Sequence, residues 1–240
     1  MSLKTFPQLV SEALRHDPGR PFITAYDESR GWRTELSMTT FANWVNKTAN
    51  LFVDEYLLGE DDTIRLDLDS HWLVPVFLGA AWTAGIAVTT DRDVAAHLVV
   101  SGPNFADHLD TDIPVVATSL DAFAGRFATA LPEGVDDFGA LWPGQPDVFI
   151  NPAPPTEMSV AWRYPDDSAS QKELVARAHQ VMAQRQGTRL LTAFHPLHDC
   201  AVPTVLTALL QQGSLVYVAH PRDEEWVERY GSERVTDTLA

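Results

Sequence analysis

Two short stretches of the chain carry residue types that could bind an ion or a ligand. The first is the cluster of His195, His198, Asp199 and Cys200, whose side chains are all of the types that zinc accepts. A metal site also needs ligands from elsewhere in the chain that converge on the same point. We therefore predict no metal ion and no cofactor. His195, His198 and Asp199 remain candidates for the lining of a ligand pocket.

The second stretch contains Ser168, Ser170 and Lys172, at the predicted start of a helix. The first backbone N–H groups of a helix have no partner within it, so hydroxyl and ammonium groups beside them could help to hold an anion. The same residues have an explanation without a ligand, because Ser170 and Glu173 have the spacing of a capping box. We favour the capping box and keep a nucleotide-binding remnant as the alternative.

Covalent catalysis has little support in the sequence. Cys200 and a nearby histidine have the chemistry of a nucleophile and its base, but nothing marks a set of oxyanion donors. The chain contains no Gly-x-Ser-x-Gly elbow, Walker loop or dinucleotide fingerprint. A hydrolytic or transfer role for residues 195–200 is kept only as a third hypothesis.

Hydrophobic periodicity predicts the elements that must position these residues. Helices are expected over 6–14, 39–55, 72–84, 170–186, 202–212 and 223–230. Strands are expected over 22–26, 32–36, 63–68, 86–89, 97–101, 114–118, 159–163, 189–193 and 214–218. Strands that alternate with helices predict an α/β fold with parallel or mixed sheets flanked by helices. The residues after 230 are expected to fray.

A proline-rich stretch, 132–158, predicts a long ordered loop between two parts of the chain. We therefore expect a first α/β subdomain over 1–131 and a second α/β segment over 159–240, packed on the first.

Composition excludes several classes of partner. The 240 residues include 33 acidic and 17 basic side chains, which gives a formal net charge of -16. A field of this sign repels nucleic acid and anionic membrane surfaces. The chain has one cysteine, no apolar signal core at its start and no apolar run long enough for a membrane span. We expect a cytoplasmic protein.

Several short sequence motifs occur in the same order as in one enzyme superfamily. They are Leu36–Phe41, Thr48–Phe52, Gly59–Asp62, Phe77–Gly85 and Phe194–Leu197, the last followed by a helix, a glycine and a strand. In this order they resemble the N-terminal region of the AMP-forming acyl-CoA synthetases and luciferases, the adenylate-forming superfamily. The resemblance covers nearly all of the chain. It implies that residues 195–200 join the end of a strand to a helix, with His198 and Asp199 near its cap.

The departures from this family pattern concern its chemistry. The family binds ATP phosphates with a Thr-Ser-Gly-Thr-Thr-Gly-x-Pro-Lys-Gly loop, whereas the matching stretch here, 164–173, has no glycine and contains Asp166 and Asp167. Two charges about 4 Å apart interact by roughly 4 kcal/mol at an effective dielectric of ~20, so these carboxylates oppose ATP. Lys172 is the remnant of the motif, and Asp199 stands where the family has a histidine. The chain also ends before the family's later motifs, so it resembles a truncated, degenerate relative.

The resemblance and its departures leave two main hypotheses. The first is a non-catalytic synthetase-like protein that acts as a homo-oligomer or through a protein partner, with Trp142 and Trp226 marking a contact surface. The alternative is a protein that binds an acyl, CoA-type or nucleotide ligand, or an enzyme, that uses a retained pocket near residues 194–210.

Overall fold

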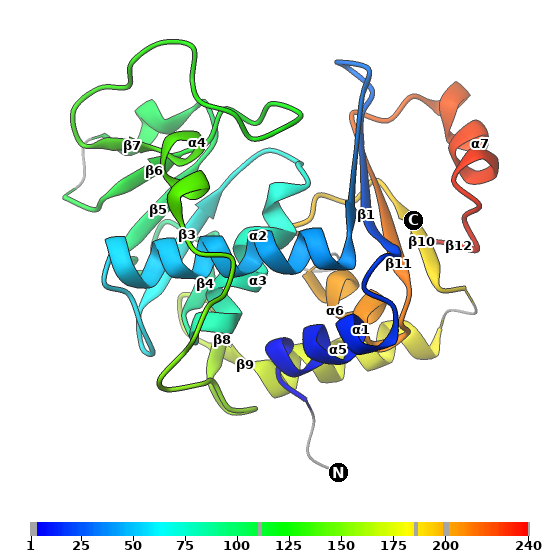
Figure 1. The fold of residues 1–240 in the computed structure, drawn as a ribbon, viewed down its shortest axis with the longest axis horizontal. Coiled ribbons are helices and arrows are strands. Elements are labelled where there is room, and N and C mark those ends of the chain that lie inside the picture. Colours follow the sequence, from blue (N-terminus) through cyan, green and yellow to red (C-terminus); the bar gives the residue numbers. More distant parts are fainter. Residues whose placement is uncertain (1–3, 110–111, 185–186, 199–201, 240) are drawn as a thin grey trace. The chain divides into compact units, whose positions relative to one another are not determined.

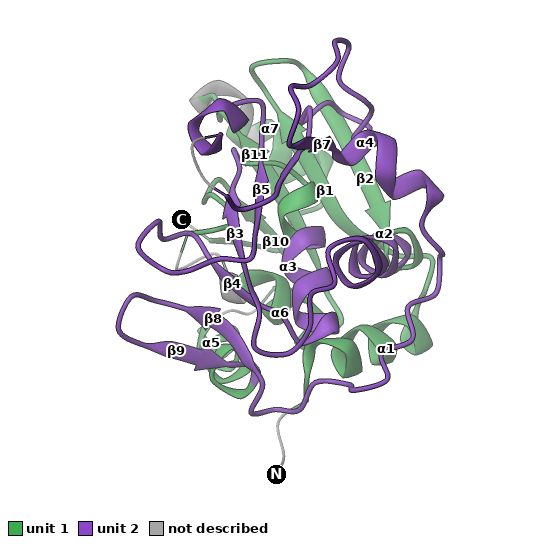
Figure 2. Ribbon diagram, turned by 90° about the vertical axis from the view of Figure 1, so that its left-hand side faces the viewer, with its two compact units in different colours: residues 1–42, 70–75, 172–240 green, residues 43–69, 76–171 purple. Residues whose placement is uncertain are grey.

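The computed structural model describes residues 4–109, 112–184, 187–198 and 202–239 (Figure 1). By its internal contacts the chain divides into two compact units. Unit 1 comprises residues 1–42, 70–75 and 172–240, and unit 2 comprises residues 43–69 and 76–171 (Figure 2). Each unit contains one of the two sheets. This division differs from the expected one at 132–158, because both units combine segments that are far apart in the sequence.

Unit 1 is built around a five-stranded sheet with the order β12-β10-β11-β1-β2. Its strands are parallel except β2, which runs antiparallel to β1. The strands expected over 22–26 and 32–36 are therefore confirmed, and they pair as a hairpin. The elements of unit 1 are α1 (Phe6–His16), β1 (Pro21–Asp27), β2 (Trp32–Ser37), β10 (Arg189–Thr192), α6 (Val202–Leu210), β11 (Ser214–Ala219), α7 (Asp223–Ser232), β12 (Asp237–Leu239) and most of α5 (Gln171–Ala183).

Unit 2 contains a seven-stranded sheet with the order β7-β6-β5-β3-β4-β8-β9, in which only the β8–β9 pair is antiparallel. The predicted α/β class with mixed sheets is therefore correct. Its strands are β3 (Thr63–Asp67), β4 (Ala87–Thr89), β5 (Leu98–Ser101), β6 (Val115–Ala117), β7 (Val135–Asp137), β8 (Val160–Arg163) and β9 (Ser168–Ser170). Its helical segments are most of α2 (Met38–Asn50), a π-helical turn (Leu51–Glu55), most of α3 (Leu73–Ala84), a 3-10 turn (Phe105–His108), α4 (Phe138–Leu141) and a second 3-10 turn (Trp142–Gly144).

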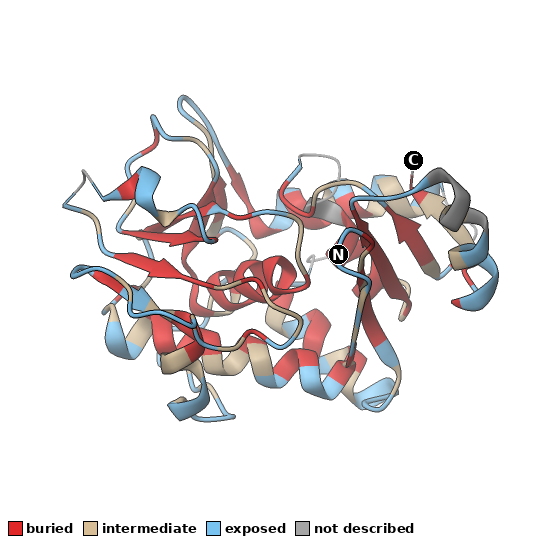
Figure 3. Cartoon of the chain, turned by 90° about the horizontal axis from the view of Figure 1, so that it is seen from above, coloured by how far each residue is buried: buried red, intermediate tan, exposed pale blue. Residues whose placement is uncertain are grey.

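The apolar pattern of the sequence explains where the core lies. Every residue of β4, β5 and β6 is buried, as expected for parallel strands that are covered on both faces (Figure 3). In α3, the fully buried Trp82 donates its indole N–H to Ala161 O on β8 at 2.9 Å. Gln171 Nε2 donates to Trp82 O at 2.8 Å. These two hydrogen bonds satisfy buried polar groups of Trp82 and fix α3 against β8.

The proline-rich segment is more structured than the sequence suggested. Residues 135–137 form β7 at one edge of the sheet, and Asp137 then caps α4 by accepting a hydrogen bond from Gly139 N–H at 2.9 Å. Trp142 lies in this segment and packs on Trp44, with ring centroids 3.9 Å apart, while its indole N–H donates to Ala124 O. The predicted long ordered loop thus contains a strand and a helix that the sequence did not reveal, because β7 is only three residues long and is defined by its pairing with β6.

The end of the chain is also ordered, contrary to the expected fraying. Residues 237–239 form β12, which pairs in parallel with β10, and both Val235 and Leu239 are buried. Trp226, on α7, packs against a buried cluster that includes Val216 and Val235. Trp226 and Trp142 therefore both serve internal packing. The tail is held because the edge of β10 offers unpaired backbone groups that β12 satisfies.

Among the helices that the structure describes, none combines the length and the apolar character needed to cross a membrane.

Replacement of Gly187 by alanine tests the docking of this C-terminal strand. A Cβ at Gly187 would lie 2.5 Å from Thr236 Oγ1 and 2.6 Å from the carbonyl carbon of Thr236. We expect Gly187→Ala to lower the free energy of unfolding by about 1–3 kcal/mol, because backbone atoms must shift to relieve the overlap. Urea denaturation measures this loss. The control is Gly231→Ala on α7, where no atom lies within 4 Å of the added carbon. Equal stability of the two variants would contradict the ordered position of residues 236–239.

Candidate functional site

The stretch that the sequence matched to a phosphate-binding loop forms the turn of the β8–β9 hairpin. Tyr164 N–H donates to Asp167 O at 2.8 Å, which closes the turn over four residues. Ser168 N–H donates to Asp167 Oδ1 at 2.7 Å. Asp166 and Asp167 are exposed. The Ser168 N–H, a backbone donor that could face an anion, is thus already bonded to a carboxylate of the chain itself.

The three residues of the predicted nucleotide-binding remnant lie on two elements. Ser168 and Ser170 are the first and last residues of β9, and Lys172 is the second residue of α5. Ser168 and Lys172 are exposed, whereas Ser170 is buried. Lys172 and Ser168 therefore face solvent at the two sides of a buried serine. The anion-site and capping-box interpretations both stay predictions.

The predicted ligand-pocket residues follow the carboxyl end of β10. His195 Nδ1 accepts a hydrogen bond from Leu197 N–H at 3.1 Å, and His198 N–H donates to His195 O at 2.9 Å. The rings of Phe194 and His198 stack with centroids 6.0 Å apart. Asp199 and Cys200 lie outside the described residues. Within the described part of the chain, no three His, Cys, Asp or Glu side chains are placed to hold a metal ion.

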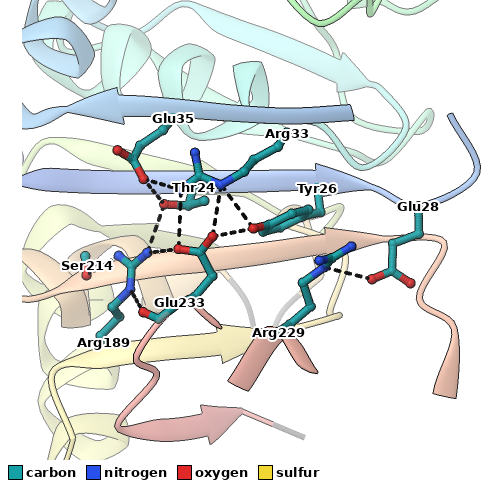
Figure 4. A network of polar contacts seen from close by, with 9 residues as sticks. All are labelled: Thr24, Tyr26, Glu28, Arg33, Glu35, Arg189, Ser214, Arg229 and Glu233. Atoms are coloured by element: carbon teal, nitrogen blue, oxygen red, sulfur yellow. Dashed lines mark hydrogen bonds and ion pairs between the residues drawn. The ribbon is translucent and has the colours of Figure 1, made fainter. Parts of the chain in front are cut away.

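The most connected polar cluster of unit 1 involves a residue that the sequence had placed in the fraying tail. The carboxylate of Glu233 accepts hydrogen bonds from Arg33 Nε at 2.9 Å, from Arg189 Nη2 at 2.5 Å and from the hydroxyl of Tyr26 (Figure 4). Arg189 Nε also donates to Glu233 O at 2.6 Å. The Glu233 side chain is only 8% exposed. The cluster therefore joins β1, β2, β10 and the C-terminal segment.

The charge of Glu233 is set by these partners. Burial alone would raise the pKa of the Glu233 carboxyl, but hydrogen bonds from Arg33, Tyr26 and Arg189 outweigh it and lower the pKa from 4.5 to about 2. Burial and the contact with Glu233 raise the pKa of Tyr26. Glu233 is therefore charged and Tyr26 protonated at neutral pH. A general base needs a pKa near the working pH, and the pKa of Glu233 is far lower. The charges of this cluster are therefore fixed at neutral pH.

A pocket of about 410 Å³ lies beside this cluster, within unit 1. Its wall is formed where β1, β10 and β11 begin, so it lies at the amino edge of the sheet, whereas His195 follows the carboxyl end of β10. The lining residues are mostly polar: Arg20, Pro21, Glu35, Thr188, Arg189, Gln212, Gly213, Ser214, Ser232, Glu233 and Arg234. Sequence reasoning missed this pocket because its residues come from five separate stretches of the chain.

Comparison with known proteins places the chain among its relatives. It is 33% identical over 247 residues to a TIGR03089 family protein of Mycobacterium tuberculosis (strain ATCC 25618 / H37Rv), and the match covers 96% of each chain. The chain belongs to the TIGR03089 family. No family model matches its sequence.

Solved structures show the fold of this TIGR03089 family member. Coronafacic acid ligase from Pectobacterium brasiliense superimposes with a TM-score of 0.79 over 98% of this chain at 8% identity. The luciferase-like enzyme from the mealworm Zophobas morio gives 0.78 over 100% at 9% identity. The N-terminal domain of FACL13 from Mycobacterium tuberculosis gives 0.72 over 99% at 14% identity. The chain spans 49%, 60% and 63% of these proteins, respectively. The resemblance to the N-terminal region of AMP-forming acyl-CoA ligases is thus confirmed, and it concerns the fold.

Removal of the charge of Glu233 tests how much its ion pairs with Arg33 and Arg189 stabilise unit 1. Because the native pKa of Glu233 lies below that of the unfolded chain, its contribution is complete above pH 4.5 and is lost as the pH falls toward 2. We expect Glu233→Gln to lower the free energy of unfolding at pH 7 by on the order of 2 kcal/mol. The loss in the free energy of unfolding relative to the wild type should shrink steadily between pH 4.5 and pH 2. Thermal unfolding at a series of pH values measures this loss.

The matched control is Glu12→Gln, which removes the same charge from an exposed pair with Lys4. Exposed ion pairs contribute about 0–1 kcal/mol, so this control should change little at any pH. A Glu233→Gln deficit that is constant from pH 7 to pH 2 would show that packing, and not charge, explains the loss.

Proposed function

We propose that this chain is a non-adenylating relative of the acyl-CoA ligases that acts by binding and does not activate a carboxylate. The observation that carries the proposal is the β8–β9 turn. In place of a glycine-rich loop it has Asp166 and Asp167, both exposed, and the Ser168 N–H is already occupied by Asp167 Oδ1. A phosphate-binding loop needs free backbone N–H groups and a close approach of the backbone, which glycine permits.

The charge of the chain supports the same conclusion. Its formal net charge of -16 opposes the approach of a nucleotide triphosphate to any part of the surface that lacks a local positive charge. Lys172 is exposed near the turn, but the two aspartates offset its single charge. The likeness to acyl-CoA ligases therefore suits a retained scaffold with changed chemistry, since one fold can carry several functions.

Calorimetric titration with Mg-ATP tests the absence of adenylation. We expect no binding heat up to millimolar nucleotide, because carboxylates stand where the phosphates would lie. The control variant is Asp166→Asn with Asp167→Asn, which removes both charges and leaves the turn without glycine. It should also stay silent, since the free N–H groups are still missing. Micromolar binding of Mg-ATP by the wild type, with ATP–pyrophosphate exchange on adding a carboxylic acid, would overturn the proposal.

Exposed apolar side chains favour a protein partner or a second copy of the chain as the bound molecule. Ile150 is 82% exposed, and Val148 and Met158 in the same proline-rich segment are 65% and 64% exposed. Apolar groups of this size are costly in water when they lie near one another. We propose that residues 148–158 form the contact segment, in a homo-oligomer or with a different protein.

Light scattering during size-exclusion chromatography tests this association. We expect the wild type to elute above its monomer mass of 26.5 kDa and Ile150→Ser with Met158→Ser to shift toward the monomer. Phe123→Ser is the comparison variant, because Phe123 is 83% exposed but lies on a different loop. A monomeric wild type would turn the search to a different protein partner. Equal shifts for both variants would contradict the assignment to residues 148–158.

Small-molecule binding without acyl activation is the second candidate function. It is favoured by the pocket at the amino edge of the unit 1 sheet, whose volume of about 410 Å³ suits a small ligand. This pocket differs from the region near residues 194–210 that the sequence indicated.

A further inference from the structure

The pocket at the amino edge of the five-stranded sheet carries a local excess of positive charge. Three arginines line it, Arg20, Arg189 and Arg234, together with two glutamates, Glu35 and Glu233. Arg33 lies outside the lining but bonds to both glutamates. With Asp17, whose charge acts on Arg20, four guanidinium groups therefore stand beside three carboxylates, in a chain whose formal net charge is -16.

The two glutamates are committed to the other two arginines. Glu233 accepts from Arg33 and from Arg189, at 2.9 and 2.5 Å. Glu35 accepts from Arg33 Nη2 at 2.6 Å and from the hydroxyl of Thr24 at 3.2 Å. Among the described residues, neither glutamate bonds to Arg20 or Arg234. The excess charge of the pocket is therefore located on these two arginines.

Arg20 is partly exposed as a residue, but its guanidinium group is buried and lacks a hydrogen-bond acceptor. Its three guanidinium nitrogens are shielded from solvent and have no hydrogen-bond partner in the described part of the chain. Burial lowers the pKa of Arg20, while the charge of Asp17 raises it. The Phe22 ring, 5.9 Å from the guanidinium carbon, stabilises the cation only weakly at that distance. A buried charge that lacks an acceptor is costly, and a bound anion would remove this cost.

Arg234 has an unfavourable backbone conformation. Its φ is +52°, in the left-handed region that costs energy for any residue with a side chain. Its backbone N–H donates to Gly231 O at 3.2 Å, and within the described residues its exposed side chain makes no ion pair. Such strain persists where the surrounding structure imposes it, often at binding sites.

The remaining polar groups of the pocket suit a ligand that also carries a hydroxyl group. Ser214 Oγ accepts from Arg189 Nη1 at 3.0 Å, which leaves its own proton available for donation to an anion. Gln212 Oε1 is buried and lacks a hydrogen-bond donor among the described residues. It is an acceptor, so a hydroxyl group of the ligand could satisfy it, whereas an anionic oxygen could not.

We propose that this pocket binds a small phosphate monoester that also carries a hydroxyl group. The phosphate lies against the exposed Arg234. Arg20 and Gln212, whose guanidinium group and Oε1 atom are closed to solvent in the free protein, turn toward the pocket on binding, Arg20 to donate to the phosphate and Gln212 Oε1 to accept from the hydroxyl group. The proposal rests on the small-molecule binding function, the second candidate, and is independent of the β8–β9 turn, which belongs to unit 2.

Calorimetry in a buffer free of phosphate, with inorganic phosphate and glycerol 3-phosphate as the probes, tests the site. We expect the wild type to bind both, with glycerol 3-phosphate about tenfold tighter, and to ignore acetate and glycerol. Arg20→Gln should weaken both probes at least about tenfold. Gln212→Met should weaken glycerol 3-phosphate and leave inorganic phosphate unchanged, because only the ester has the hydroxyl group.

The control is Arg15→Gln, which removes the same charge from an exposed helix position where Arg15 bonds to Ser11. It should leave both affinities within about twofold of the wild type. Arg20→Gln should also melt at or above the wild-type temperature without ligand, since it removes an unpaired buried cation. Millimolar glycerol 3-phosphate should then raise the melting temperature of the wild type and not that of the variant.

Four outcomes separate this site from the proposed lack of adenylation. The site is overturned if the wild type binds neither phosphate probe. It is also overturned if Arg15→Gln and Arg20→Gln lose equal affinity for the probes. Neither outcome affects the conclusion about ATP. Mg-ATP binding that survives Arg20→Gln contradicts the non-adenylating function and assigns ATP to another place. Mg-ATP binding that is lost in Arg20→Gln supports the phosphate site.

Discussion

The buried carboxylate of Glu233 is the interaction that holds the strands of the five-stranded sheet to the C-terminal segment. It accepts from Arg33 on β2, Arg189 on β10 and Tyr26 on β1, so one buried charge joins three strands to the segment that leads into β12. A second pair, Arg229 with Glu28, connects α7 to the residue after β1, and the Arg229 guanidinium covers the Tyr26 ring at 4.1 Å. A buried carboxylate is tolerable only with such partners, so these elements must be present together.

The ion pairs of Glu233 also determine the charge of the neighbouring pocket. Because Glu233 and Glu35 are taken by Arg33 and Arg189, neither glutamate pairs with the two other arginines of the wall. The same charges that stabilise the sheet thus leave a positive surface in a strongly acidic chain. In unit 2 the balance is reversed, because the β8–β9 turn presents Asp166 and Asp167 to solvent.

The packing of each of the two sheets does not depend on the β8–β9 turn. The sheets are stabilised by buried apolar strands such as β5 and β6 and by paired polar groups such as the Trp82 indole. None of these interactions involves the β8–β9 turn, where the sequence departs from the phosphate-binding motif. A turn of this kind can change with little effect on the core, because residues 165–168 are exposed.

The sequence by itself determined the fold class and most of the longer elements, because apolar periodicity over five to thirteen residues reports directly on burial. It also identified the acidic turn, since charge and the lack of glycine are local properties. It failed for β7 and β12, which have three residues each and form only because β6 and β10 offer edges to pair with. The pocket and the role of Glu233 were likewise decided by tertiary structure alone. Residues 33, 189 and 233 are far apart in the chain, and no local pattern shows that a carboxylate will be buried between two arginines.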